Sequence, residues 1–183
     1  MLPAIRMGDV FCVDSNSILS AAIRKVTGFW SSDGSSEYNH AGVIIDHTGR
    51  TFETLWTARE NVLDAYDNKL ILIVRPIIDV DGELIEDTQK AHGIQKMRNT
   101  KEGALYPVHR LFLHFIPPLA RYFSTGRYDI CSELVTSEYL KPPPMNAWRG
   151  SAEGINPDVL ADRLRSSRLY ETIFEGELKL LCK

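Results

Sequence analysis

Cysteine is scarce in this sequence. Three cysteines occur in 183 residues, at positions 12, 131 and 182, and none of them forms a Cys-x-x-Cys motif. An odd number of widely spaced cysteines argues against a disulfide framework and predicts reduced thiols in an intracellular setting. No group of histidine, cysteine and acidic residues has the spacing of a zinc site. We therefore expect neither a metal nor another cofactor.

Long apolar runs and an excess of one charge are also missing. No apolar stretch approaches the ~18–20 residues of a transmembrane helix, so we expect no integral membrane segment. The formal net charge of −3 provides no basic field for nucleic acid, so we expect no nucleic-acid partner. Residues 1–6 lack a basic head followed by an apolar stretch, which predicts a cytoplasmic protein without a secretory signal.

The remaining composition is that of a folded chain with a mixed architecture. Hydrophobic residues make up 44% and charged residues 25%, which fits one domain over residues 1–183. Apolar and capping patterns predict an α+β fold with a β-rich first half and a helical second half. The expected strands are 10–13, 41–45, 51–56, 69–74, 169–174 and 178–181, with a hairpin turn at 47–50. The expected helices are about 16–27, 84–102, 130–140 and 156–164.

Cys131 is the strongest candidate for chemistry. It lies in the first turn of the predicted helix 130–140, where Asp129 is placed as the cap and where free N–H groups and the helix dipole favour a thiolate. The N–H of Cys131 is also placed to donate to a developing oxyanion. The structural alternative is a buried cysteine that packs as a small hydrophobe. Cys12 lies inside a strand and Cys182 near the chain end, so neither is a comparable nucleophile.

His40 is the candidate base for that thiolate. It begins a predicted strand, and Gly42 lies on the same face, which we expect to leave that face open to a cleft. The structural alternative is a histidine whose hydrogen bonds are satisfied within the sheet. His109 and His114 are the rival bases, whereas we expect His47 in a turn and His92 on a polar helix.

Glu53 is the candidate to orient the imidazole. A turn centred between Thr48 and Gly49 would pair Glu53 with Ile44 and put its side chain on the face of His40. Ile44 lies four residues along the strand from His40, a distance of roughly 13 Å. The side chain of Glu53 is therefore expected on the same face of the sheet as His40, but this pairing does not by itself bring the two side chains into contact. The alternative is a solvated, exposed glutamate.

Taken in order, these motifs resemble the permuted NlpC-type, papain-like cysteine amidases and peptidases of the YiiX-like group. The matching segments are a Gly-Asp strand at 8–10, an Asn-His-Ala-Gly strand at 39–42, Glu53 on the next strand, and Tyr-Asp-Ile-Cys-Ser-Glu-Leu-Val at 128–135. Histidine precedes cysteine, as in that permuted group. Asn39 replaces the small hydroxyl residue usual at its position. The resemblance covers roughly residues 6–140.

This resemblance implies a papain-like fold in which a small antiparallel sheet packs against the helix that bears the nucleophile. It implies amide or ester hydrolysis, on cell-wall (peptidoglycan) peptides in some members and on lipid-linked groups in others. Cys131 would attack, His40 would transfer protons and Glu53 would hold the ring. Tyr128 is a candidate substrate-binding residue, with simple packing as its alternative. The expected partner is a small peptide, amide or lipid-linked substrate.

Two other interpretations of the protein's function remain open. An apolar stretch at 111–119 is compatible with a thiol acyltransferase or lipid hydrolase of the same fold, although packing in the core also explains it. A non-catalytic, virion-associated or binding module is the third reading, against which the presence of both Cys131 and His40 argues. Without an export signal, a cell-wall substrate would require lysis or delivery by a virion or secretion machine.

Overall fold

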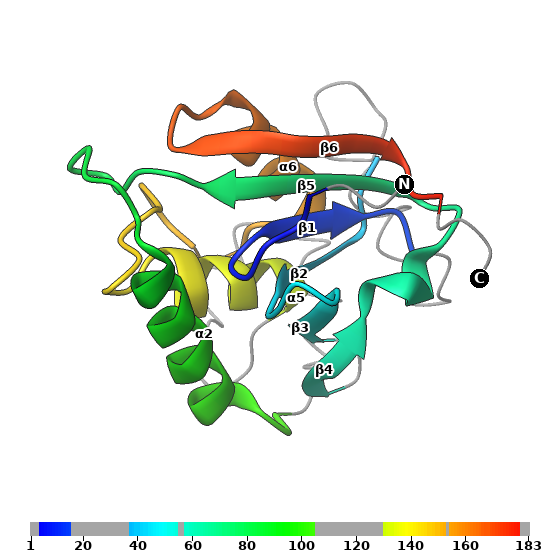
Figure 1. The fold of residues 1–183 in the computed structure, drawn as a ribbon, viewed down its shortest axis with the longest axis horizontal. Coiled ribbons are helices and arrows are strands. Elements are labelled where there is room, and N and C mark those ends of the chain that lie inside the picture. Colours follow the sequence, from blue (N-terminus) through cyan, green and yellow to red (C-terminus); the bar gives the residue numbers. More distant parts are fainter. Residues whose placement is uncertain (1–3, 16–36, 55–56, 105–129, 153, 180–183) are drawn as a thin grey trace.

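Six strands form one antiparallel sheet in the computed structural model (Figure 1), which describes residues 4–15, 37–54, 57–104, 130–152 and 154–179. The strands are β1 (Val10–Val13), β2 (His40–Ile44), β3 (Arg50–Thr54), β4 (Ala58–Val62), β5 (Leu70–Pro76) and β6 (Tyr170–Glu177). Their order is β4-β3-β2-β1-β5-β6, and every neighbouring pair is antiparallel. The last strand thus returns from the C-terminal part of the chain to the sheet built by the first half.

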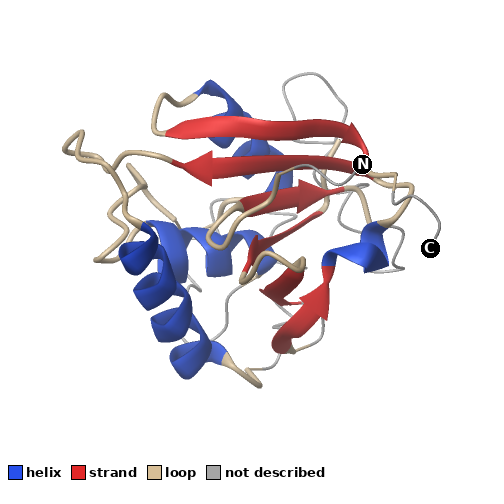
Figure 2. Ribbon diagram, viewed as in Figure 1, coloured by secondary structure: helices blue, strands red, loops and turns tan. Residues whose placement is uncertain are grey.

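The described helical segments lie between β4 and β6 in the chain. They are the 3₁₀ turn η1 (Leu63–Tyr66), the helices α2 (Asp87–Lys101), α5 (Cys131–Glu133) and α6 (Pro157–Ser166), and the π-helix η2 (Leu134–Leu140), which continues α5 without a break. Figure 2 shows α2 and the α5–η2 segment side by side. Asn156 caps α6 by accepting a 2.8 Å hydrogen bond from the N–H of Val159, as its sequence predicts.

The sheet buries a different apolar cluster on each face. Alternate residues of the central strands, such as Cys12 and Val43, join side chains of α2, η2 and α6 in the larger core. Their neighbours, such as Phe11 and Ile44, join Tyr66 of η1 in a smaller cluster. β1 is buried at every position because both of its faces are covered, whereas the edge strand β4 is mostly half-buried or exposed.

The expected α+β class is confirmed, and most expected elements in the described residues are present. The hairpin is formed by β2 and β3, and the predicted helices 84–102 and 156–164 correspond to α2 and α6. β4 was not expected from the sequence. The predicted strand 169–174 is confirmed by β6, which extends to Glu177. Residues 178 and 179 are not in a strand, and the rest of the predicted strand 178–181 lies outside the described residues. The predicted helix 16–27, the segment 105–129 and residues 180–183 lie outside the described residues.

The helix after Cys131 changes its hydrogen-bond pattern, which the sequence did not suggest. The first bond runs from the N–H of Leu134 to the carbonyl of Ile130 (2.8 Å), and the last from Lys141 to Thr136 (2.9 Å), a five-residue step. The Thr136 and Ser137 hydroxyls donate to the carbonyls of Ser132 (3.0 Å) and Glu133 (2.6 Å). Such hydroxyls compete with the backbone for these acceptors, which favours the wider π turn.

Candidate active site

His40 and Glu53 meet directly between β2 and β3. His40 Nε2 lies 2.5 Å from Glu53 Oε2, and the side chains are 4% and 0% exposed. Glu53 pairs with Gly42, the residue two places after His40 and on the same face of the sheet. The alternative of a solvated, exposed glutamate was therefore wrong.

The pairing of Glu53 with Ile44 that the sequence suggested was also wrong, and the turn explains why. The Asp46 carboxylate accepts hydrogen bonds from the N–H groups of Thr48 (2.8 Å) and Arg50 (3.2 Å) and from the Thr48 hydroxyl (2.6 Å). Gly49 takes a positive φ of 88°, and the N–H of Ile45 donates to Arg50 (2.8 Å). The turn is thereby centred one residue earlier, which moves the partner of Glu53 two residues, or roughly 7 Å, toward His40.

Tyr66 completes the environment of the Glu53 carboxylate. Its hydroxyl donates to Glu53 Oε2 at 2.6 Å, the same oxygen that contacts His40, and the Thr51 hydroxyl lies 3.4 Å from Oε1. The Tyr66 ring is 5% exposed and lies 6.0 Å from the imidazole, centroid to centroid. Sequence reasoning missed Tyr66, because it occurs in a 3₁₀ turn that carries no strand or helix periodicity.

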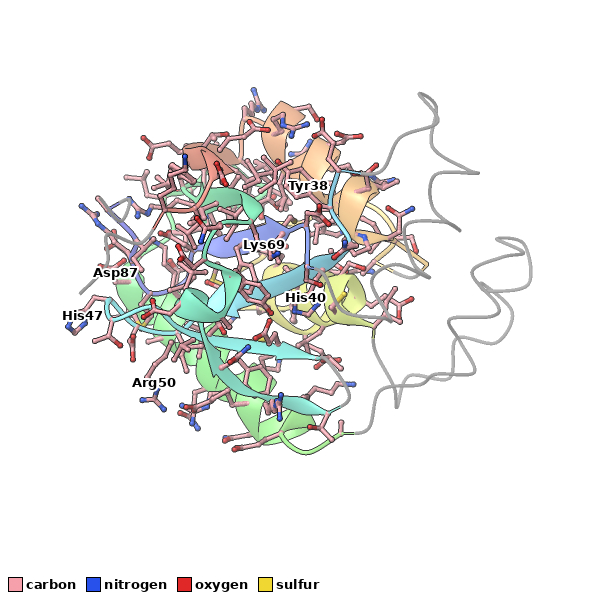
Figure 3. The ribbon with its side chains drawn as sticks, turned by 90° about the vertical axis from the view of Figure 1, so that its right-hand side faces the viewer. Tyr38, His40, His47, Arg50, Lys69 and Asp87 are labelled. Atoms are coloured by element: carbon pink, nitrogen blue, oxygen red, sulfur yellow. The ribbon has the colours of Figure 1, made fainter. Side chains whose placement is uncertain are left out.

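Cys131 is the first residue of α5, which packs against β2, and its side chain lies near enough to His40 for the two groups to interact electrostatically. Figure 3 shows His40 where β2 meets this helical segment. Because Nε2 faces Glu53, Nδ1 is the ring nitrogen left for the thiol. The N-cap position belongs to Ile130, not to Asp129 as expected, and Asp129 lies outside the described residues. The carboxylate of Glu133 accepts from the N–H of Ile130 (3.3 Å) in place of a capping side chain.

The opposite charges of His40 and its neighbours Glu53 and Cys131 stabilise one another. Burial of the imidazole lowers its pKa, but the charge of Glu53, followed by that of Cys131, outweighs burial and raises the pKa of His40 to about 10. Burial also works against the charged form of Glu53, yet His40 and the Tyr66 hydroxyl hold the pKa of Glu53 below its ordinary value. Burial and the neighbouring carboxylate raise the pKa of Tyr66, so its phenol stays a neutral donor.

Phe11 occupies the space above Gly42 that the sequence suggested would open onto a cleft. A Cβ at Gly42 would lie 2.7 Å from two Phe11 ring carbons and 3.0 Å from the Cβ of Glu53. The Phe11 ring also makes an edge contact with the imidazole, with 6.3 Å between centroids. The expected open face was thus wrong: glycine is needed there because Phe11 packs against the strand and helps to fix the His40 ring.

Two polar side chains, the buried Asn39 and the half-buried Asp158, hold the segment that leads into β2. Asn39, next to His40, accepts from the N–H of Ser15 (2.8 Å) and donates to Asp14 Oδ1 (2.6 Å), which joins the start of β2 to the end of β1. Asp158 of α6 accepts from the N–H groups of Glu37 (2.9 Å) and Tyr38 (3.2 Å), immediately before that strand. The position of His40 therefore depends on two separate anchors.

The two residues that follow Cys131 act in the same way on the helix side. The Ser132 hydroxyl donates to the carbonyl of Ile155 (2.6 Å), and Glu133 Oε1 accepts from the N–H of Gly154 (2.7 Å). Both side chains are buried. The Cys-Ser-Glu sequence thus combines one thiol with two residues that hold the neighbouring loop.

The other expected site residues are not part of this cluster as described. Tyr128, His109 and His114 lie outside the described residues. His47 and His92 are exposed, in a turn and on α2. Cys12 is completely buried in the larger core, and burial, followed by the nearby charge of Cys131, raises the pKa of its thiol far above the ordinary value.

The comparisons with known proteins identify a fold. No family model and no curated protein matches the chain. Among solved structures, the metalloprotein YiiX from Escherichia coli O157:H7 is similar to 94% of this chain, over 89% of its own chain, with a TM-score of 0.50 and 19% sequence identity. The chain therefore has the YiiX-like, α+β fold.

The described residues contain neither a membrane span nor a metal-type cluster. Within the described parts of the chain, none of the helices has both the length and the apolar character needed to cross a bilayer. Over the same residues, histidine, cysteine and acidic side chains nowhere gather in a group of three or more with the arrangement of a metal site.

Proposed function

We propose that this protein is a cysteine hydrolase of the permuted NlpC-type, papain-like class, with a single domain over residues 1–183, that cleaves an amide bond. The observation that carries the proposal is the buried imidazole of His40, which contacts the carboxylate of Glu53 and interacts electrostatically with Cys131. A nucleophile, a base and an orienting group in hydrogen-bonded series are the arrangement that covalent catalysis requires.

The chemistry follows from the geometry. His40 takes the thiol proton, and the Cys131 sulfur attacks the carbonyl carbon of the amide. The N–H of Cys131, at the start of α5, donates to the oxygen that becomes negative. The imidazolium gives its proton to the departing nitrogen, which leaves as an amine. Water, deprotonated by His40, then attacks the thioester and releases the acid and the free thiol.

The described residues do not fit a metal at this site, although the YiiX structure is named a metalloprotein. The two ring nitrogens of His40 face different partners: Nε2 faces Glu53, and Nδ1 is left for Cys131. A metal ion bound to one of these nitrogens would therefore lie on the side of only one of the other two side chains. The 2.5 Å separation of Nε2 and Oε2 is that of a short hydrogen bond. Two ligands on a tetrahedral zinc ion lie over 3 Å apart, given metal–ligand distances of about 2 Å.

The expected substrates are small peptides or amides of the cell-wall type, and Tyr128 is the proposed substrate contact. The acyltransferase and lipid-hydrolase alternative depends on residues 111–119, which lie outside the described part of the chain.

Turnover of a panel of peptide amides, including peptidoglycan stem peptides, tests the proposal. Cys131→Ala should reduce turnover on the order of 10⁴–10⁶-fold, the scale for loss of a nucleophile. Cys12→Ala, which removes the other described thiol, is the matched control and should retain activity. Mass spectrometry should detect an acyl adduct on the Cys131 peptide. Unchanged turnover in Cys131→Ala, or an adduct on another residue, would contradict the proposal.

A further inference from the structure

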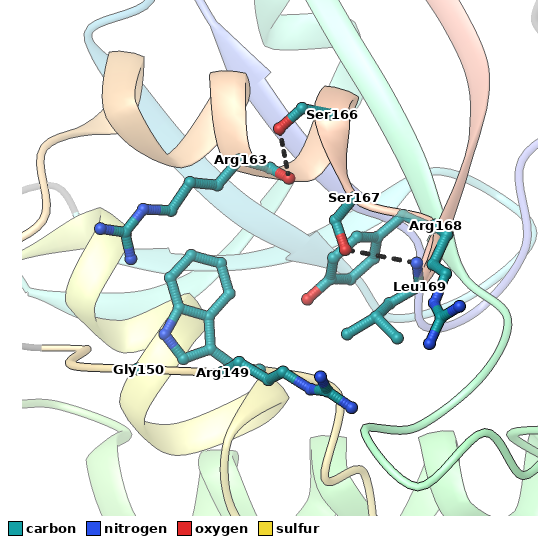
Figure 4. A pocket seen from close by; sticks show the side chains of 9 residues that line it. Arg149, Gly150, Arg163, Ser166, Ser167, Arg168 and Leu169 are labelled. Atoms are coloured by element: carbon teal, nitrogen blue, oxygen red, sulfur yellow. Dashed lines mark hydrogen bonds between the residues drawn. The ribbon is translucent and has the colours of Figure 1, made fainter.

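A pocket of about 610 Å³ lies at the C-terminal end of α6 and uses none of the residues of the candidate active site. It is shown in Figure 4 and is lined by Trp148, Arg149, Gly150, Arg163, Ser166, Ser167, Arg168, Leu169 and Tyr170. Its size is within the ~300–1,000 Å³ typical of small-molecule sites. The function proposed above gives this pocket no role.

Three arginines surround the pocket, and none of the described lining residues is acidic. Figure 4 shows Arg163 on one side and Arg149 and Arg168 on the opposite side. All three residues are exposed. Arg149 donates one N–H to the carbonyl of Val80, and the guanidinium of Arg163 lies over the indole of Trp148, 5.5 Å from its centroid. Most N–H groups of these guanidinium groups are thus available to a ligand. A bound anion would also reduce the repulsion among the three positive charges.

The floor of the pocket is apolar and fixed. Trp148, Leu169 and Tyr170 are each less than 10% exposed. The Trp148 indole donates to the carbonyl of Ser151 (3.3 Å) and the Tyr170 hydroxyl to that of Ala147, so both rings are held in place. The Ser167 oxygen accepts from the N–H of Leu169 (3.3 Å), which leaves its O–H free to donate. The floor suits an apolar or aromatic body beside the anionic group.

We infer that this pocket binds a phosphate monoester carried on an apolar body. A carboxylate offers two oxygens in one plane and a single charge. A phosphate monoester offers three oxygens and a charge of about −1.5 to −2 at neutral pH, so it can bind more than one of the three arginines that surround the pocket. The same chemistry occurs in a soluble phosphate monoester and in the headgroup of phosphatidic acid.

Titration with phenyl phosphate, followed by nuclear magnetic resonance, tests this inference. The reporter is the indole N–H of Trp148, assigned by its absence from the spectrum of Trp148→Phe. Phenyl phosphate should shift this signal saturably, whereas phenol should not, and benzoate should bind at least about tenfold more weakly. Arg163→Gln and Arg168→Gln should each weaken phenyl phosphate binding about tenfold or more, the scale of a charged hydrogen bond.

Lys96→Gln is the matched control, because it removes one exposed positive charge from α2, outside the pocket. Binding should stay within about twofold of the wild type. Equal weakening in Lys96→Gln or equal affinity for benzoate would overturn the inference.

Vesicles distinguish the two sources of the phosphate. If the protein cosediments with phosphatidic acid vesicles but not with phosphatidylcholine vesicles, and Arg168→Gln abolishes this, the phosphate is carried by a lipid. If phenyl phosphate binds but the vesicles do not, the ligand is a soluble ester. Both results support the phosphate site, and failure of both probes would overturn it.

Discussion

The Glu53→Gln substitution separates the charge of Glu53 from its hydrogen bonds. The amide oxygen of glutamine can still accept from Tyr66 or His40, and the side chain has nearly the same volume. What disappears is the negative charge that lies 2.5 Å from His40 Nε2. Because both side chains are almost fully buried, solvent screens this charge only weakly.

The expected effect is a large fall in the pKa of His40. In the wild type, that pKa is raised from 6.5 to about 10, although burial of the ring lowers it. Glu53 is the first influence that raises it, and the thiolate of Cys131 the second. We expect Glu53→Gln to lower the pKa of His40 by roughly 2 to 3 pH units, which corresponds to charge pairing on the order of 3 to 4 kcal/mol.

The assay is a pH titration of the His40 Cε1–H resonance, assigned with His40→Ala. Glu60→Gln is the control, since Glu60 lies on the adjacent strand β4 and its carboxylate pairs with Arg50 and Arg98. This control should leave the titration of His40 within about half a pH unit of the wild type. If His40 also titrates within half a unit of the wild type in Glu53→Gln, the charge of Glu53 does not hold the imidazolium and the reasoning fails.

The same pair predicts a pH dependence of stability. Since folding raises the pKa of His40, its stabilising contribution is complete below about pH 6.5 and is lost as the pH rises toward 10. Since folding lowers the pKa of Glu53, its contribution is present above about pH 4.5 and is lost as the pH falls. Urea unfolding across pH should show both losses in the wild type, and the alkaline loss should be smaller in Glu53→Gln.

Three further outcomes are expected. Iodoacetamide should label Cys131 before Cys12 in the native protein near pH 6, because Cys131 contacts His40 whereas Cys12 is completely buried with a raised pKa; equal rates across pH would contradict the assigned nucleophile. His40→Ala should slow this labelling near neutral pH and His92→Ala, an exposed control on α2, should not; the reverse result would mean that the wrong histidine was chosen. Tyr66→Phe removes the 2.6 Å hydrogen bond to Glu53 and should alter the titration of His40 while costing about 1–3 kcal/mol of stability, and an unchanged titration would make Tyr66 purely structural.

The sequence determined the class of most elements and the choice of residues at the candidate site. Period-two alternation put His40, Gly42 and Glu53 on one face of a hairpin, and the structure has them there. Asn156 predicted the start of α6 through an ordinary capping bond. These inferences succeeded because they depend on interactions between residues close in the chain.

Register was decided by the tertiary structure. A shift of two residues leaves every strand side chain on the same face, so alternation cannot distinguish Ile44 from Gly42 as the partner of Glu53. The hydrogen bonds that Asp46 makes across the turn select Gly42. Contact with His40 follows from that selection and not from the facing pattern.

Long-range contacts decided the rest of the site. Tyr66 reaches Glu53 from a 3₁₀ turn, Phe11 fills the space above Gly42, and Cys131 meets His40 only because the helix packs beside β2. None of these contacts leaves a local periodic signal, since each joins segments that are distant in the chain. The sequence thus supplied the chemical groups, and packing of the helix and the turn against the sheet brought them together.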